Sequence, residues 1–347
     1  MWRNPLRSLT AQLRPIKTPD ADLTGKVVII TGANSGLGLE AARLFVRFNA
    51  KTVILGCRDI QSGEHAKRDI EVSENKPGDV VQVWKIDLAS YNSVTEFCRR
   101  VTTELSRLDI VVANAGLIAS RYEAFEGYER QLTVHVISTF LMVLLLLPMM
   151  RRTKAMDSQQ HTPISLPRRL ATTDVPHIVI VGSNSHFYTQ FPERKEPSIF
   201  EALRGDSNMG DRYGTTKLLS VLIVRELAEH MVLDKELEPS VILNTLDPGY
   251  CQTRLLRENA YSRPLMWILA IASTLVGRTA EMGARTYVLA ASAGRESHGR
   301  YMEDGEISRE SGFVYSQEGQ VVQKRAYIEL REILERIQPG ISNHIQG

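Results

Sequence analysis

KVVIITGANSGLGLEAARLFVRFNA, residues 26–50, is the stretch that decides the fold. Four apolar residues, 27–30, form a run typical of a buried strand, and apolar residues at helical spacing follow the glycines. Between them, Gly32, Gly36 and Gly38 form a turn in which only small residues let a phosphate approach the backbone. The free N–H groups and positive dipole end of the following helix favour an anion. The stretch therefore predicts a phosphate cradle between a strand and a helix.

The composition is that of an ordinary globular protein. Of the 347 residues, 43% are hydrophobic and 24% are charged. A net charge of +2, from 42 basic and 40 acidic residues, lacks the basic excess of a nucleic-acid-binding surface. Three cysteines, Cys57, Cys98 and Cys251, lie far apart and predict neither a disulfide framework nor a zinc site. The cysteines therefore favour a reducing, cytoplasmic environment. The histidines form no ligand pair, so we expect no metal.

Strand-like and helix-like segments alternate from residue 26 onward. Expected strands are 27–30, 52–56, 80–86, 109–113, 177–183 and 240–246, and expected helices include 61–73, one from about 92, 127–150 and 212–231. An apolar stripe near the C-terminus predicts one more helix, packed on the core: Tyr327, Leu330, Ile333, Leu334 and Ile337. The alternation predicts βαβ units, hence an α/β fold with a parallel sheet and helices on both faces.

Three segments fall outside this alternation. Residues 1–23 form an N-terminal tail with apolar residues at amphipathic spacing, which either contacts a membrane or docks on the protein itself. Residues 151–176 are polar and proline-containing, and we expect a mobile surface insertion there. Two apolar runs, 140–150 and 264–276, are shorter than the roughly 20 residues that a membrane-spanning helix needs. We interpret the first run, 140–150, as a buried helix. Residues 24–340 are expected to form one catalytic domain.

Tyr213 and Lys217 lie four residues apart in YGTTK, so a helix places both on one face. A tyrosine ordinarily titrates near pH 10, and a nearby ammonium would bring its pKa toward working pH for acid–base catalysis. Ser183 stands at the end of an expected parallel strand, where the ligand crevice of such sheets lies. Its hydroxyl could therefore bond a substrate carbonyl oxygen beside Tyr213.

These motifs together resemble the short-chain dehydrogenase/reductase family. The stretches are TGANSGLG at 31–38, NAG at 114–116, Ser183, YGTTK at 213–217 and DPG at 247–249, in the family's order, and the resemblance covers residues 24–315. It is greatest for the retinol-dehydrogenase-like branch, particularly fungal members associated with secondary metabolism. Supporting stretches lie at 57–59, 137–148, 278–286 and 296–302.

The resemblance implies a single-domain, Rossmann-type, doubly wound parallel sheet of about seven strands. It implies hydride transfer between a nicotinamide and a carbonyl or carbinol carbon, with Tyr213 handling the proton. Lys217 would lower the pKa of Tyr213 and hold the nicotinamide ribose, and Ser183 would orient the substrate oxygen. Asp87 would meet the adenine, Asn114 the adenosine side, and Cys251 to Thr253 the nicotinamide amide. The implied coenzyme-binding set is Gly32, Ser35, Gly36, Leu37, Gly38, Arg58, Asp87, Leu88, Asn114, Ala115, Gly116, Tyr213, Lys217, Pro248, Gly249, Cys251 and Thr253.

One position departs from the family pattern. Where the family has an asparagine whose backbone holds a relay water, this chain has His135, in LTVHVISTF. Two interpretations are open. Either a backbone carbonyl serves whatever the side chain, or the imidazole replaces the relay or weakens turnover.

The end of the second strand bears on the choice of coenzyme. An NAD site places a carboxylate there for the ribose 2′-hydroxyl, whereas a 2′-phosphate favours arginine. The carboxylate position is Cys57, and Arg58 follows, which predicts NADP(H). The alternative is that Arg58 is an ordinary solvated side chain.

Residues 254–279 carry more apolar side chains than a surface loop needs. We interpret this segment as the cover of a lipophilic substrate, with membrane contact or a dimer surface as the alternative. The resemblance makes helices 128–150 and 212–231 the face of a homo-oligomer. Two other functions remain: a coenzyme-binding scaffold or sensor, which would not need Ser183, Tyr213 and Lys217 together, and a sugar-nucleotide epimerase or dehydratase, whose TGxxGxxG turn differs.

Overall fold

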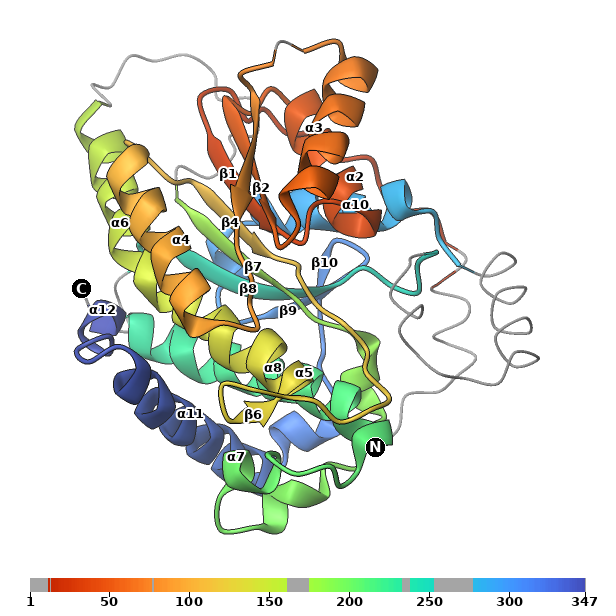
Figure 1. Ribbon diagram of the computed structural model, residues 1–347, viewed down its shortest axis with the longest axis vertical. Coiled ribbons are helices and arrows are strands. Elements are labelled where there is room, and N and C mark those ends of the chain that lie inside the picture. The colour runs from red at the N-terminus through yellow and green to blue at the C-terminus, as the bar shows by residue number, and fades with distance from the viewer. Residues whose placement is uncertain are drawn as a thin grey trace.

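The computed structural model describes Gln12 and residues 14–76, 78–160, 175–232, 238–252 and 277–346. Its centre is an eight-stranded sheet in the order β10-β9-β8-β7-β4-β1-β2-β3 (Figure 1). All neighbours pair in parallel except β9 and β10. The strands are β1 (Val27–Thr31), β2 (Thr52–Cys57), β3 (Val81–Lys85), β4 (Ile110–Ala113), β7 (His177–Val181), β8 (Ile242–Asp247), β9 (Tyr301–Glu303) and β10 (Glu306–Ser308).

Helices cover both faces of the sheet, as the alternating sequence predicted. One apolar core joins the sheet to α2 (Gly36–Arg47), α3 (Ile60–Glu74) and α10 (Ala280–Ala291). The other joins it to α4 (Tyr91–Glu104), α6 (Ser138–Gln160), α8 (Met209–Met231) and α11 (Gln317–Ile337). The doubly wound parallel fold is therefore confirmed, with seven parallel strands. The eighth strand, β10, is a three-residue antiparallel edge with no apolar run to signal it.

The long apolar helix differs at both ends from the predicted 127–150. It is preceded by a small hairpin of β5 (Ala124–Phe125) and β6 (Tyr128–Glu129), by α5 (Arg130–Leu132), and by a π-helical stretch, η1 (Thr133–Ile137). At the other end, α6 continues to Gln160, so residues 151–160 are helix rather than insertion. Asp157 explains the extension, because its carboxylate pairs with Lys26 at 3.6 Å and Arg107 at 3.0 Å. Residues 161–174 lie outside the described part.

Residues Arg130–Asp157 are long and apolar enough to cross a membrane by length and composition. However, 89% of the most apolar window is buried inside the fold. Phe140, Leu141 and Leu147 are fully enclosed in the core shared with α4 and α8. The segment at 140–150 therefore occupies the place predicted for it, a buried helix.

The C-terminal segment packs on the core, which confirms the prediction from its apolar stripe. Tyr327, Leu330 and Leu334 of α11 are buried against α8. The following short helix, α12 (Asn343–Gln346), lies against α6, where the Arg151 guanidinium donates to the carbonyls of His344 and Ile345, both at 2.6 Å. The two helices assigned above to a homo-oligomer face are thus covered by the chain's own end (Figure 1).

The described part of the N-terminal segment docks on the same chain. Ile16 and Leu23 are buried, and the Ile16 carbonyl accepts a hydrogen bond from Arg285 of α10 at 3.0 Å. Gln12 makes two bonds with the backbone of Tyr250, at 2.6 and 3.0 Å. Residues 1–11 and Leu13, which carry the amphipathic spacing, lie outside the described part.

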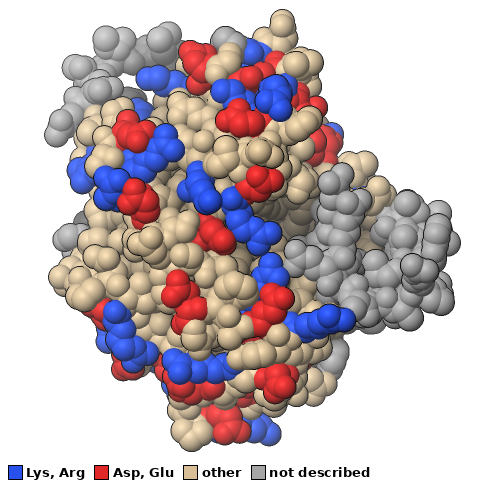
Figure 2. All heavy atoms as spheres, viewed as in Figure 1, with Lys and Arg blue, Asp and Glu red and all other residues tan. Residues whose placement is uncertain are grey.

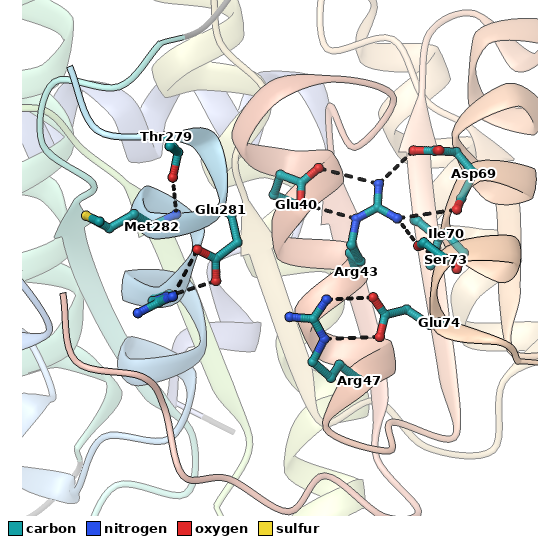
Figure 3. A network of polar contacts seen from close by, with 11 residues as sticks. Glu40, Arg43, Arg47, Asp69, Ile70, Ser73, Glu74, Thr279, Glu281 and Met282 are labelled. Carbon is teal, nitrogen blue, oxygen red and sulfur yellow. Dashed lines mark hydrogen bonds and ion pairs between the residues drawn. The ribbon is translucent and has the colours of Figure 1, made fainter. Parts of the chain in front are cut away.

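Ion pairs hold α2, the helix after the glycine turn, against α3 (Figure 3). Arg43 contacts Asp69 at 2.6 Å and also the hydroxyl of Ser73, while Arg47 pairs with Glu74 at 2.7 Å. Elsewhere on the face drawn in Figure 2, basic and acidic side chains are interspersed.

Candidate active site

The glycine turn between β1 and α2 is built as the sequence predicted. Gly32 and Gly36 have φ of 67° and 58°, in the left-handed region that favours glycine. A Cβ on Gly38 would lie 2.6 Å from both the Gly32 carbonyl oxygen and the Asn114 side-chain nitrogen. Ser35 is the N-cap of α2, yet its side chain makes no capping bond. Three glycines in this turn leave its backbone open to close approach. Together with the start of a twelve-residue helix that has no side-chain cap, the turn fits a coenzyme diphosphate.

Asn114 holds this turn in place, and its predicted contact with the adenosine side of the coenzyme stays a prediction. Its Nδ2 donates to the carbonyls of Thr31 at 2.8 Å and Gly32 at 3.3 Å. Its Oδ1 accepts from the hydroxyl of Tyr287 in α10, at 2.7 Å. Thr31 adds a second tie, because its hydroxyl accepts the backbone N–H groups of Asn114 and Ala115. Thr31 and Tyr287 were missed from the sequence, since neither partner is near in the chain.

Ser183, Tyr213 and Lys217 come together at the carboxyl end of the sheet. Ser183 follows β7 and caps a 3-10 turn, η2 (Asn184–Phe187), accepting the Ser185 N–H at 3.2 Å. Its side chain also faces the Tyr213 phenol, where it favours the phenolate and acts to lower the pKa of Tyr213. Lys217, buried on α8, donates to the Val181 carbonyl at 2.7 Å, and its Nζ lies 5.7 Å from the Tyr213 ring centre. The predicted trio is therefore one cluster.

The titration behaviour of this cluster follows from its burial. Burial raises the pKa of Tyr213 to about 12, although Ser183 acts in the opposite direction. This direction is opposite to the predicted lowering by Lys217, because loss of solvent outweighs the favourable interactions of the phenolate. Burial also lowers the pKa of Lys217 to about 8, against the attraction of the Asp247 carboxylate. At neutral pH both groups keep their protons.

Asp247 is a buried carboxylate that the sequence interpretation did not single out beyond the DPG motif. It ends β8, and its Oδ1 accepts the Gly249 N–H at 3.1 Å. Burial raises the pKa of Asp247 to about 6, with the neighbouring Glu303 acting in the same direction. Gly249 has a φ of 76°, and a Cβ there would lie 2.6 Å from the Arg278 guanidinium.

His135 lies in η1 and is 3% exposed. Its Nε2 accepts the Leu117 N–H at 3.0 Å, and its Nδ1 lies 2.9 Å from the Thr216 hydroxyl. The ring meets the Tyr213 ring edge to face, with centres 5.7 Å apart. His135 therefore contacts the cluster, as its position in the sequence predicted.

The end of β2 carries the residues expected to read the ribose. The Cys57 side chain is buried, and burial raises the pKa of its thiol to about 12, so it is neutral. Arg58 is exposed, and no described residue pairs with its guanidinium. The Asp59 carboxylate turns to cap α3, accepting the Gln61 N–H at 3.0 Å.

The remaining predicted residues border the same end of the sheet or lie outside the described part. The Asp87 carboxylate, after β3, accepts the Ala89 N–H at 3.0 Å. Leu88 is buried, and Gly116 is exposed beside His135. The Cys251 thiol lies 3.4 Å from the Pro248 carbonyl, and Leu37 faces Gly283 of α10. Thr253 and residues 254–276, predicted to cover the substrate, are outside the described part.

A cavity of about 200 Å³ lies beside η2. Its walls include the aromatic rings of Phe187, Phe191 and Phe313. None of Ser183, Tyr213 and Lys217 lines it. The cavity is therefore separate from the cluster, and we do not assign the substrate to it.

Comparison with known proteins agrees with this geometry. Residues 26–157 match the family described as short chain dehydrogenase. The short chain dehydrogenase/reductase dmxR8 of Cryptosporiopsis sp. is 37% identical over 332 residues, which are 94% of this chain and 95% of that protein. This chain is a short-chain dehydrogenase/reductase. The short chain dehydrogenase atnD of Emericella nidulans is 41% identical over 314 residues, 87% of this chain and 92% of that protein.

The fold of this short-chain dehydrogenase/reductase also matches solved structures. A crystal structure of an uncharacterised protein from Mycobacterium paratuberculosis superposes with a TM-score of 0.62, at 22% identity, over 91% of this chain and 95% of that one. Membership of the family makes the chain an oxidoreductase that binds a nicotinamide coenzyme and acts on CH–OH or C=O groups. The cradle at Gly32–Gly38 is the feature of this structure that fits such a coenzyme.

Proposed function

We propose that this short-chain dehydrogenase/reductase uses NADPH to reduce a ketone or aldehyde of a lipophilic small molecule. The observation that carries the proposal is the cluster of Ser183, Tyr213 and Lys217, next to a glycine turn. A scaffold that only binds coenzyme would need the turn without the cluster.

The preference for the phosphorylated coenzyme rests on the end of β2. An NAD site needs a carboxylate there, and Cys57 supplies a buried, neutral thiol instead. Arg58 is exposed and without a partner among the described residues, so its guanidinium is available for a 2′-phosphate. The nearby acid, Asp59, is held by the α3 N-terminus, where its charge is favoured.

Each residue of the cluster has a distinct task in this mechanism. The bound coenzyme supplies the hydride. Ser183 orients the carbonyl oxygen of the substrate, and the Tyr213 hydroxyl gives that oxygen its proton. Lys217, held by the Val181 carbonyl, places a positive charge behind Tyr213 that favours the phenolate left after proton transfer. Thr31 and Asn114 hold the turn that would bind the diphosphate.

The lipophilic character of the substrate rests on the apolar residues of 254–279. The fungal relatives support a role in secondary-metabolite biosynthesis. The three separated cysteines support a reducing, cytoplasmic compartment. Contact of residues 1–11 with a membrane surface is part of the same proposal, because a lipophilic substrate partitions into lipid; the described remainder of the tail docks on the protein itself.

A coenzyme-oxidation screen tests the proposal. Purified protein with NADPH is offered lipophilic ketones, aldehydes and quinones, and loss of NADPH absorbance is followed. We expect turnover with at least one class, a preference for NADPH over NADH, and loss of that preference in Arg58→Ala. Tyr213→Phe should bind NADPH normally and lose turnover by 10²- to 10⁴-fold, the usual contribution of a general acid. Equal inertness of wild type and Tyr213→Phe, with coenzyme still bound, would support the scaffold instead.

A further inference from the structure

The hydrogen bonds of His135 fix the protonation of its ring. The Leu117 backbone N–H can only donate, so Nε2 must present a lone pair to it at 3.0 Å. The Thr216 hydroxyl donates its own proton to the Tyr213 carbonyl at 2.9 Å, so it must accept at its lone pair from Nδ1. Only the neutral ring with its proton on Nδ1 satisfies both partners. Burial, together with the charge of Lys217, keeps the pKa of His135 well below its usual value, in agreement.

The two partners belong to different halves of the site. Leu117 follows Asn114–Gly116, the loop after β4 that borders the glycine turn. Thr216 lies on α8 between Tyr213 and Lys217, and it is fully buried. The imidazole therefore joins the loop at Asn114–Leu117 to α8, the helix that carries Tyr213 and Lys217. The chain leaves room for it, because a Cβ on Gly116 would approach the ring nitrogen to 3.2 Å.

The local backbone also adapts to this span. Residues Thr133–Ile137 form a π-helical stretch, in which the Ser138 N–H bonds the Thr133 carbonyl five residues back. Such a wide turn inserts one extra residue into a helix, and it is frequent at functional sites. Here it carries the histidine, whose ring meets the edge of Tyr213.

We propose that His135 is a positioning residue: as a neutral strut, it fixes the distance between the loop at Asn114–Leu117 and the helix that carries Tyr213. It carries no proton in turnover, because one ring nitrogen holds a backbone N–H and the proton of the other is committed to Thr216. The inference rests on the proposed role of Tyr213 for its effect on rate, whereas the strut itself is independent of that role.

A series of substitutions separates a strut from a proton carrier. Asparagine reaches only the Nδ1 position and keeps the bond to Thr216, glutamine reaches only the Nε2 position and keeps the bond from Leu117, and phenylalanine keeps neither. We expect His135→Asn and His135→Gln to lower the reduction rate about tenfold, the cost of one hydrogen bond, and His135→Phe to lower it further. The apparent pKa values of the rate should stay those of wild type in all three. His65→Asn, on the exposed face of α3, is the matched control and should change nothing.

Thr216→Val gives a second arm, since it removes the Nδ1 partner with little change of shape. Its effect should not add to that of His135→Phe, because both variants break one bridge. Amide hydrogen exchange at Leu117 is a readout without turnover, and we expect faster exchange in His135→Phe but not in Thr216→Val or His65→Asn. If wild type shows no turnover, this exchange difference still tests the strut, and the failure falls on the proposed function alone. A loss of 10²- to 10⁴-fold in His135→Asn with a lost limb of the pH profile, or unchanged Leu117 exchange in His135→Phe, would overturn the inference.

Discussion

Replacing Gly38 by alanine tests whether the glycine turn is held as tightly as its contacts indicate. The added Cβ would lie 2.6 Å from the Gly32 carbonyl oxygen and from Asn114 Nδ2, whereas ordinary contact begins at 3.4 Å. One side of the turn must therefore move by 3.4 − 2.6 = 0.8 Å. Overpacking of this kind costs about 1–3 kcal/mol, and the better helix propensity of alanine returns at most about 1 kcal/mol. The shift falls on the groups that would meet the diphosphate.

We expect Gly38→Ala to weaken NADPH binding at least about tenfold, since 1.4 kcal/mol corresponds to a factor of ten. Fluorescence titration with NADPH measures the dissociation constant, and thermal unfolding measures the effect on the fold. Gly210→Ala is the matched control: it is also a helical glycine, and a Cβ there meets nothing within 4 Å. The control should bind NADPH normally and be at least as stable as wild type. Wild-type affinity in Gly38→Ala would refute the reasoning.

Four further outcomes follow from the contacts in the fold. Tyr287→Phe should lower the free energy of unfolding by about 1–3 kcal/mol, because Asn114 Oδ1 loses its donor, and urea denaturation measures it. Asp247→Asn should shift the alkaline fall of the reduction rate to lower pH, because Lys217, whose pKa is about 8, loses a neighbouring negative charge; Glu306→Gln, an exposed acid, should leave the profile unchanged. Because burial raises the pKa of Asp247 to about 6, protonated Asp247 stabilises the fold at low pH, and this contribution is lost as pH rises through 6. Asp247→Asn should therefore increase the free energy of unfolding more at pH 8 than at pH 4. A dimer through α6 and α8 should not form, because α11 and α12 cover them. A dimer mass in light scattering that is lost when a charged residue replaces Ile328, on the exposed side of α11, would locate the interface there instead, whereas a dimer that forms only when α11 is removed would be expected.

The parts of the fold that depend on local pattern could be predicted from the sequence. The apolar run at Val27–Ile30 and the apolar spacing after Gly38 specify β1 and α2, because strand and helix periods differ. The end of α6 could not be predicted in this way. Asp157 is held in the helix by ion pairs with Lys26 and Arg107, which are both distant in the chain. Strands β9 and β10 are three residues each, too short to show a period.

The same division holds for the site. Tyr213 and Lys217 were predictable because one helix turn joins them, and Ser183 because parallel strands end at one edge. The raised pKa of Tyr213 was not predictable, because it depends on burial of the side chain in the folded protein. Nor was the partnership of Asn114 with Tyr287, 173 positions away.

Three polar side chains of this site make their bonds inside the protein. Asn114 holds the glycine turn, His135 joins the loop after β4 to α8, and Lys217 bonds the last carbonyl of β7. Each ties a strand end or its loop to a separate element, so the three parts that must meet around a carbonyl and a coenzyme are fixed to one another in advance. Catalysis by a positioned acid depends on such fixed distances, because a misplacement of about 1 Å can cost a hundredfold in rate. The internal bonds of Asn114, His135 and Lys217 therefore set the geometry in which Ser183 and Tyr213 act, although none of these bonds transfers a proton.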